Sequence, residues 1–158
     1  MHFQKLYYHV FCWLKLLLYH MIYFNSLQLP WNLSFRRGFH IAIEGDGHVK
    51  VGNHCFFNNY CTIAACTSVT IGDGTIFGEN VKIYDHNHRY ADPVKSIKEQ
   101  GYSTAPVNIG RHCWIGSNVV ILKGVTIGDN CVIGAGCIIY KDVQAGSVVV
   151  NKQDLMIK

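Results

Sequence analysis

Two histidines stand close together at residues 85–88, which read Asp-His-Asn-His, and they are the first candidates for chemistry. Histidine has the ordinary pKa closest to neutrality, so it can take a proton from a hydroxyl group or bind a metal ion. His86 and His88 open a polar, turn-rich segment that runs from Tyr84 to Asn108. Long loops of this kind within a compact domain are often functional. The alternative is a pair of solvated loop histidines, because nine histidines are spread along the chain.

A strict sequence repeat follows this segment, and we expect the repeat to form the secondary structure that positions the segment. From residue 109 onward an isoleucine recurs every six residues, and a small or β-branched residue stands four places after each one. The isoleucines are Ile109, Ile115, Ile121, Ile127, Ile133 and Ile139, and the second row is Cys113, Val119, Val125, Cys131, Cys137 and Val143. The residue after each isoleucine reads glycine, glycine, large apolar, which is a period of eighteen. Six-residue units grouped in threes predict an all-β fold, a parallel β-helix of triangular section.

The upstream half carries the same repeat less regularly. Its lead residues are Val51, Phe57, Ile63, Ile71, Phe77 and Ile83, and the step from Ile63 to Ile71 is eight residues rather than six. Two residues are therefore inserted at one corner. Between Ile83 and Ile109 the periodicity stops, which predicts one long loop excursion at 84–108. We expect a single domain, 1–158, with the β-helix over 39–158.

The N-terminal segment, residues 1–38, is predicted to be helical and apolar. Residues 6–24 are almost wholly apolar or aromatic, and Pro30 is expected to end the helical part. The longest part without a polar side chain, Leu16 to Tyr19, is too short to cross a bilayer, which takes about 20 apolar residues, and so is the looser stretch from Leu16 to Phe24. One interpretation is a helix that covers the open end of the β-helix and its unpaired strand edge. The other is peripheral contact with a membrane surface, with Lys5 and Lys15 reaching to lipid head groups.

Composition narrows the class of protein further. The chain has 158 residues, of which 49% are hydrophobic and 15% charged, so it is expected to fold as one domain. The formal charge of +4 comes from 14 basic and 10 acidic residues, and Arg36-Arg37 is the only dibasic pair. This charge is too scattered to predict a nucleic-acid partner.

Seven cysteines indicate a reduced, cytoplasmic protein. No small-residue cleavage site follows the apolar start, so a signal peptide is not expected. No pair of cysteines has the spacing of a metal site, so no metal is expected. Five cysteines occupy the small-residue positions of the repeat, where a free thiol packs as a compact apolar group: Cys55, Cys61, Cys113, Cys131 and Cys137.

The repeat resembles that of the hexapeptide-repeat acyltransferases, in the branch with galactoside, maltose and xenobiotic acetyltransferases. Residues 109–119 read IGRHCWIGSNV and residues 124–130 read GVTIGDN, both close to that branch's pattern. The resemblance covers residues 45–145. It implies that the β-helix is left-handed and that three copies form a homotrimer, with each active site in a cleft between neighbouring subunits.

The resemblance also implies site residues. His86 matches the family's general base, and His88 is the reserve candidate, also expected to contact substrate. Asn58 matches an asparagine on the acceptor side of the cleft, although it could equally serve corner geometry. Acetyl-CoA, the acyl donor, is expected to lie along the C-terminal coils, against Trp114, Ser117, Ala135, Tyr140 and Lys141.

Two departures from the family pattern stand out. The family usually continues through a Gly-x-Pro turn that bounds the coenzyme, whereas residues 151–154 here read Asn-Lys-Gln-Asp. Galactoside-type enzymes have an acidic residue near the positions of Ala65 and Cys66, and its absence favours a different acceptor.

The expected function is acetyl transfer from acetyl-CoA to a hydroxyl of a sugar, glycan or cell-surface polysaccharide precursor. The transfer is expected to be direct, without an acyl-enzyme, in the cytoplasm or at the inner face of the membrane. Two alternatives stay open. One is a non-catalytic scaffold or trimerisation module. The other is a zinc enzyme of the carbonic anhydrase type, which binds zinc between subunits through three histidines; His86, His88 and His112 could supply the number, although their spacing does not fit that group.

Overall fold

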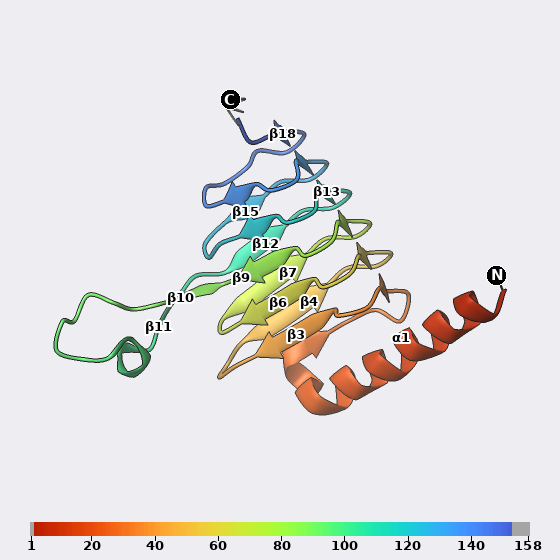
Figure 1. The fold of residues 1–158 in the computed structure, drawn as a ribbon, viewed down its shortest axis with the longest axis horizontal. Helices are drawn as coiled ribbons and strands as arrows, with labels where there is room; N and C mark the ends of the chain where they lie inside the picture. The colour runs from red at the N-terminus through yellow and green to blue at the C-terminus, as the bar shows by residue number, and fades with distance from the viewer. Residues whose placement is uncertain (1, 153–158) are drawn as a thin grey trace, which may run out of the picture.

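The computed structural model describes residues 2–152 and, within them, the side chains from residue 10 onward. The chain forms a left-handed parallel β-helix with one helix, α1, at its N-terminal end (Figure 1). Three sheets form the three faces of the triangle. The first face comprises β1 (Leu27–Gln28), β4 (His48–Val51), β7 (Ser68–Ile71), β12 (Val107–Ile109) and β15 (Thr126–Ile127).

The other two faces are built in the same way. The second face comprises β2 (Ser34–Phe35), β5 (Phe56–Phe57), β8 (Ile76–Phe77), β13 (Trp114–Ile115), β16 (Val132–Ile133) and β18 (Val148–Val149). The third face comprises β3 (His40–Ile43), β6 (Thr62–Ala65), β9 (Lys82–Tyr84), β14 (Val120–Ile121) and β17 (Ile138–Ile139). Within each face, every strand pairs in parallel with the strand one coil away.

The periodic residues are the core. Ile71 pairs with Ile109 and Ile109 with Ile127, so the coils resume in register after the interruption. The lead residues point inward and are buried, and in the N-terminal coils aromatic rings fill the interior, with Phe57 stacked on Phe77 at 4.3 Å. The predicted triangular β-helix is confirmed.

The five cysteines predicted to be interior are all buried. Each thiol also donates a hydrogen bond to a carbonyl in the next coil, for example Cys61 Sγ to Gly78 O at 3.1 Å and Cys113 Sγ to Gly128 O at 3.2 Å. Thr75 occupies the same position and donates its hydroxyl to Gly110 O at 2.8 Å. A small side chain with a donor therefore both fills this position and satisfies a corner carbonyl, which explains the frequency of cysteine there.

Glycine after a lead isoleucine is required by close stacking of the coils. A Cβ added at Gly116 would lie 2.6 Å from Ala135 N and 2.9 Å from Ile133 O. We expect Gly116→Ala to lower the free energy of unfolding by about 1–3 kcal/mol, the usual cost of overpacking. Gly134→Ala is the matched control, because there the nearest atom is 3.1 Å away. Urea denaturation measures both, and an equal loss in the two variants would contradict this interpretation.

Helix α1 (His2–Tyr23) is followed by a short 3₁₀ turn, η1 (Phe24–Ser26). The prediction that Pro30 ends the helix is wrong, because the chain turns at Phe24, which has φ 31°, and Leu27 already pairs in a sheet. The β-helix accordingly begins at Leu27 rather than at residue 39. A larger part of the N-terminal segment than predicted belongs to the first coil.

Helix α1 covers the open end of the β-helix with polar side chains. Cys12 donates to Phe35 O at 3.1 Å, Lys15 donates to Phe39 O, and Tyr23 donates to Ile41 O at 3.1 Å. The Tyr19 hydroxyl accepts from Ile41 N at 3.2 Å. These bonds occupy backbone groups of the first coil that have no neighbouring strand, which agrees with the covering role. The side chain of Lys5, predicted to reach lipid head groups, lies outside the described side chains.

The excursion leaves the coils after β9 and returns at β12, so it spans residues 85–106. It contains an antiparallel hairpin, β10 (His86–His88) with β11 (Tyr102–Thr104), and a short 3₁₀ helix, η2 (Ile97–Gln100). It projects well away from the coils (Figure 1). The predicted interruption is confirmed, but its stem is a hairpin rather than a loop, and Tyr84 and Asn108 lie in strands.

Candidate active site

The root of the excursion is anchored by a buried carboxylate. Asp85 is 0% exposed, and its two oxygens accept hydrogen bonds from the backbone N–H groups of Cys66 at 2.8 Å and Thr67 at 2.7 Å. Cys66 and Thr67 lie within the eight-residue step from Ile63 to Ile71. The insertion at one coil and the excursion at the next therefore meet at Asp85. Sequence reasoning missed this residue.

His86 is held by the same carboxylate. Its Nδ1 lies 3.0 Å from Asp85 Oδ1, and its side chain is 18% exposed. Because a carboxylate only accepts hydrogen bonds, Nδ1 is the donor in this contact, which leaves Nε2 as the acceptor nitrogen of a neutral ring. Tyr102 contacts the ring edge-on at 4.9 Å. A histidine whose tautomer is fixed by a buried carboxylate has the arrangement of a general base.

His88 has a different environment. It is exposed, its ring lies 4.7 Å from that of Tyr102, and it lines an open groove of about 570 Å³ beneath the excursion. Three basic residues, Arg89, Lys95 and Lys123, line the same groove together with two acidic ones, Asp92 and Glu99. His88 therefore lies two residues from His86 on the hairpin, on an exposed surface that carries charges of both signs.

Cys66 joins this cluster unexpectedly. Its sulfur and one ligand-type atom each of Asp85 and His86 lie within 4.8 Å of one another, the one such group found among the described residues. The Asp85 carboxylate already accepts three hydrogen bonds, from Cys66 N, Thr67 N and His86 Nδ1. Within one chain, His86, His88 and His112 do not form such a group among the described residues.

The Cys66 thiol is a poor nucleophile at neutral pH. Burial raises the pKa of Cys66, and the negative charges of Asp85 and Glu44 raise it further. A raised pKa leaves less thiolate near neutrality, so attack by this sulfur on a thioester is disfavoured.

Thiol reagents should separate the cysteines into two groups. Burial raises the pKa of Cys55, Cys61 and Cys113, and all five interior thiols lie in the core. We expect a disulfide reagent at neutral pH to modify only Cys12 and Cys66 in the folded protein, and all seven cysteines after unfolding. Peptide mass spectrometry identifies the modified sites. Modification of interior cysteines as fast as Cys66 would contradict the packing described above.

A second group of predicted residues lies on another edge of the triangle. We call the corner between the second and third faces the glycine edge; it contains Asn58, Ser117 and Ala135, with Gly78, Gly116 and Gly134. Asn58 Oδ1 accepts a hydrogen bond from Asn59 N at 2.9 Å, so the Asn58 side chain contributes to the geometry of the corner. Ser117 Oγ accepts from Glu79 N at 3.1 Å, and Ala135 is exposed.

The remaining predicted residues are exposed on the C-terminal coils. Trp114 lies on β13 of the second face and is 56% exposed. Tyr140 and Lys141 follow β17, at the corner from which the excursion leaves two coils earlier, and Lys141 Nζ lies 5.6 Å from the Tyr140 ring. We call that corner, between the third and first faces, the excursion edge. The predicted site is thus divided within one chain between the glycine edge and the excursion edge.

Known proteins share this fold and sequence pattern. A family model described as the hexapeptide repeat of succinyl-transferase matches residues 106–141. The structure is similar to that of a maltose O-acetyltransferase from Clostridium difficile 630, with a TM-score of 0.68 and 30% identity over 82% of this chain and 67% of the other. This chain belongs to the hexapeptide-repeat acetyltransferase family. The resemblance predicted from residues 45–145 is confirmed.

Other members of the family are similar over shorter stretches. A hexapeptide-repeat-containing acetyltransferase from Vibrio cholerae O1 biovar eltor, solved as a complex with acetyl-coenzyme A, has a TM-score of 0.63 and 29% identity over 73% of this chain and 61% of its own. Nodulation protein L of Rhizobium leguminosarum bv. viciae is 44% identical over 80 residues, which is 50% of this chain and 40% of that protein.

The putative lipopolysaccharide biosynthesis O-acetyl transferase WbbJ of Escherichia coli is 31% identical over 107 residues, 63% of this chain and 55% of that protein. This family member therefore spans about half the length of the curated relatives it matches. The departure from the Gly-x-Pro turn at residues 151–154 lies partly outside the described residues.

Proposed function

We propose that this protein is an O-acetyltransferase that moves acetyl from acetyl-CoA to a hydroxyl group of a sugar or glycan. The observation that carries the proposal is the His86–Asp85 pair at the root of the excursion, with Nδ1 held at 3.0 Å from a buried carboxylate. Relatives named as O-acetyltransferases, and one solved with acetyl-coenzyme A, support the reaction and the donor. The relation to the lipopolysaccharide-biosynthesis protein favours a cell-surface polysaccharide precursor as acceptor.

The reaction needs one base and no covalent enzyme intermediate. His86 Nε2 takes the proton of the acceptor hydroxyl while that oxygen attacks the thioester carbonyl. The tetrahedral intermediate collapses, the carbon–sulfur bond breaks, and the imidazolium returns the proton to the coenzyme thiolate. Asp85 stabilises the imidazolium in between, as a carboxylate does in a catalytic triad. Asn58 and backbone N–H groups are the candidates to stabilise the developing oxyanion.

The proposal includes a homotrimer with shared sites. His86 and His88 lie on the excursion edge, whereas Asn58, Ser117 and Ala135 lie on the glycine edge. Two edges of one triangle face in different directions, so these residues can meet when the excursion edge of one copy faces the glycine edge of the next. A cyclic assembly of three copies repeats this contact without leaving an unpaired edge.

The coenzyme would lie along the C-terminal coils. Trp114 and Tyr140 present exposed aromatic rings on which the adenine can stack, and Lys141 offers a positive charge to the phosphates. Ser117 and Ala135 would border the pantetheine arm. A cytoplasmic location is part of the proposal, because all seven cysteines are unpaired, as expected in a reducing compartment.

Calorimetry with acetyl-CoA, followed by release of free coenzyme A with a panel of sugars, tests the proposal. We expect binding and acceptor-dependent release. Binding without release by any hydroxyl acceptor would contradict the transferase assignment. The lack of any binding would favour the scaffold alternative.

A further inference from the structure

The outward face of α1 is apolar, although the helix already covers the coil end with its other face. The polar side chains Lys15, Tyr19 and Tyr23 point to the first coil and bond to its backbone. The opposite side carries large apolar residues that are each between 38% and 66% exposed: Val10, Trp13, Leu14, Leu17, Leu18, Met21 and Ile22. None of the residues 10–23 on this side is charged. An exposed apolar face of this size is typical of contact with another surface.

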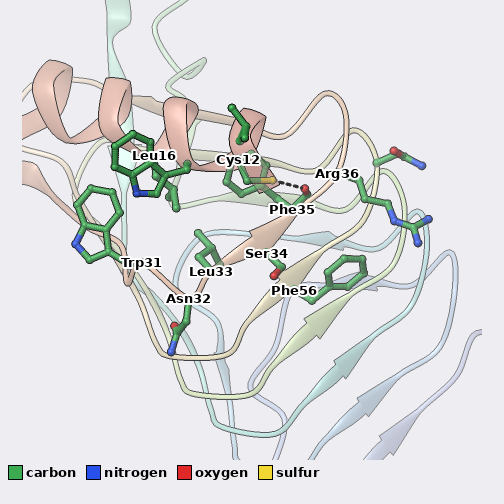
Figure 2. Close-up of a pocket in the computed structure, with 12 residues that line it drawn as sticks. Cys12, Leu16, Trp31, Asn32, Leu33, Ser34, Phe35, Arg36 and Phe56 are labelled. Atoms are coloured by element: carbon green, nitrogen blue, oxygen red, sulfur yellow. Dashed lines mark hydrogen bonds between the residues drawn. The ribbon is translucent and has the colours of Figure 1, made fainter. Parts of the chain in front are cut away.

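This apolar face extends into a groove between α1 and the first coil. The groove has a volume of about 960 Å³ and is lined by Val10, Trp13, Leu16 and Trp31, with Arg36 at its far end (Figure 2). The rings of Trp13 and Trp31 lie 6.2 Å apart, and Trp31 is 57% exposed. Tryptophan beside exposed aliphatic side chains, with arginine at the rim, is the composition that favours a membrane interface.

The distribution of charge indicates which kind of surface covers this face. Residues 1–43 contain no aspartate or glutamate and four basic residues, Lys5, Lys15, Arg36 and Arg37. The other ten basic residues of the chain are balanced by its ten acidic ones. The whole formal charge of +4 therefore belongs to the segment that forms α1 and the first coil. Lys15 points to the coil, so Arg36 and Arg37 are the described charges of this segment that a surface can reach, and an anionic lipid surface complements an apolar face with such charges near it.

We propose that α1 and the groove beside it form a membrane-contacting surface that binds anionic phospholipid bilayers. The helix lies flat on the bilayer, with the outward side chains in the interface and Arg36 and Arg37 near the phosphate groups. No described helix is long and apolar enough to cross a membrane. Helix α1 lies at the opposite end of the coil stack from the C-terminus (Figure 1), so the bilayer would meet the base of the β-helix. This inference does not depend on the proposed acetyl transfer.

Co-sedimentation of the full chain with vesicles tests the proposal. We expect binding to phosphatidylcholine vesicles that contain phosphatidylglycerol, and at least about tenfold weaker binding to pure phosphatidylcholine. The triple variant Leu14→Ser, Leu17→Ser and Met21→Ser should also bind at least about tenfold less, because three inserted side chains are lost. Its matched control replaces exposed apolar residues elsewhere, Val94→Ser, Ile97→Ser and Val150→Ser, and should bind like the wild type.

A charge variant gives an independent test that leaves the helix intact. Arg36→Gln with Arg37→Gln should weaken binding to anionic vesicles about tenfold or more. The double variant Lys98→Gln and Lys152→Gln removes the same charge far from the proposed surface and should have much less effect. Equal losses in the two double variants would overturn the assignment of the surface. A wild-type protein that stays in the supernatant with anionic vesicles would also overturn the proposal. If the triple serine variant then differs from the wild type in sedimenting mass, the outward face is an interface between copies of the chain.

Discussion

Replacing His86 by alanine is expected to lower kcat for acetyl transfer at least about 100-fold, the usual contribution of a general base. Binding of acetyl-CoA should change little, because the predicted coenzyme contacts lie on the C-terminal coils. Steady-state release of coenzyme A gives kcat, and calorimetry gives the affinity for acetyl-CoA. The combination of a large loss in kcat with intact binding identifies a group that acts in the transition state.

His88→Ala is the matched control for this experiment. His88 lies two residues along the same strand and contacts the same tyrosine ring. It is exposed, and the hydrogen bond described for Asp85 goes to His86 and not to His88. We expect its effect on kcat to be far smaller than that of His86→Ala. Equal kcat in His86→Ala and wild type would remove His86 from the mechanism, and a larger loss in His88→Ala would transfer the role to His88.

Asp85→Asn is expected to lower kcat about 100-fold, because a small displacement of a catalytic group can cost that much. An amide offers one acceptor oxygen where the carboxylate has two, so it cannot hold Cys66 N, Thr67 N and His86 Nδ1 together. The excursion should also loosen, which lowers the thermal midpoint of unfolding. Kinetics and calorimetric unfolding on the same samples measure both effects.

Asp142→Asn is the matched control for Asp85→Asn. The Asp142 carboxylate also accepts a backbone hydrogen bond at the excursion edge, from Thr126 N at 2.7 Å, but no histidine contacts it through a described hydrogen bond. We expect this variant to lose some stability and to keep a kcat close to that of the wild type. If both variants lose kcat equally, Asp85 acts only through stability and not by positioning His86.

The repeat made most of the fold predictable. Burial of two residues in every six is a strong, local signal, so Ile109 to Ile139 and the second row predicted the coils, their register and the interior cysteines. The interruption at 84–108 was predictable because periodicity stops there. The N-terminal boundary was missed although Leu29, Phe35 and Ile41 are buried and recur every six residues there, because the apolar run at 6–24 was extended to Pro30.

The site was predictable only in part. His86 could be selected because its residue type and its place in the family pattern both indicate a base. Asp85 was missed because its partners, the N–H groups of Cys66 and Thr67, belong to the preceding coil and have no residue-type signature. The signal that could have found it is the coincidence of the two-residue insertion with an acidic residue one coil later. The division of site residues between two edges requires the fold itself.

The most direct test of the account mixes two inactive variants. Chains with His86→Ala and chains with Ala135→Trp, which blocks the glycine edge, are co-expressed with different tags, and assemblies that contain both are isolated. If each site combines the excursion edge of one copy with the glycine edge of the next, about one third of the wild-type rate should return in the isolated mixed trimers, because one of the three sites in each has both edges unaltered. Mixed assemblies no more active than the two variants alone would contradict a shared acetyl-transfer site.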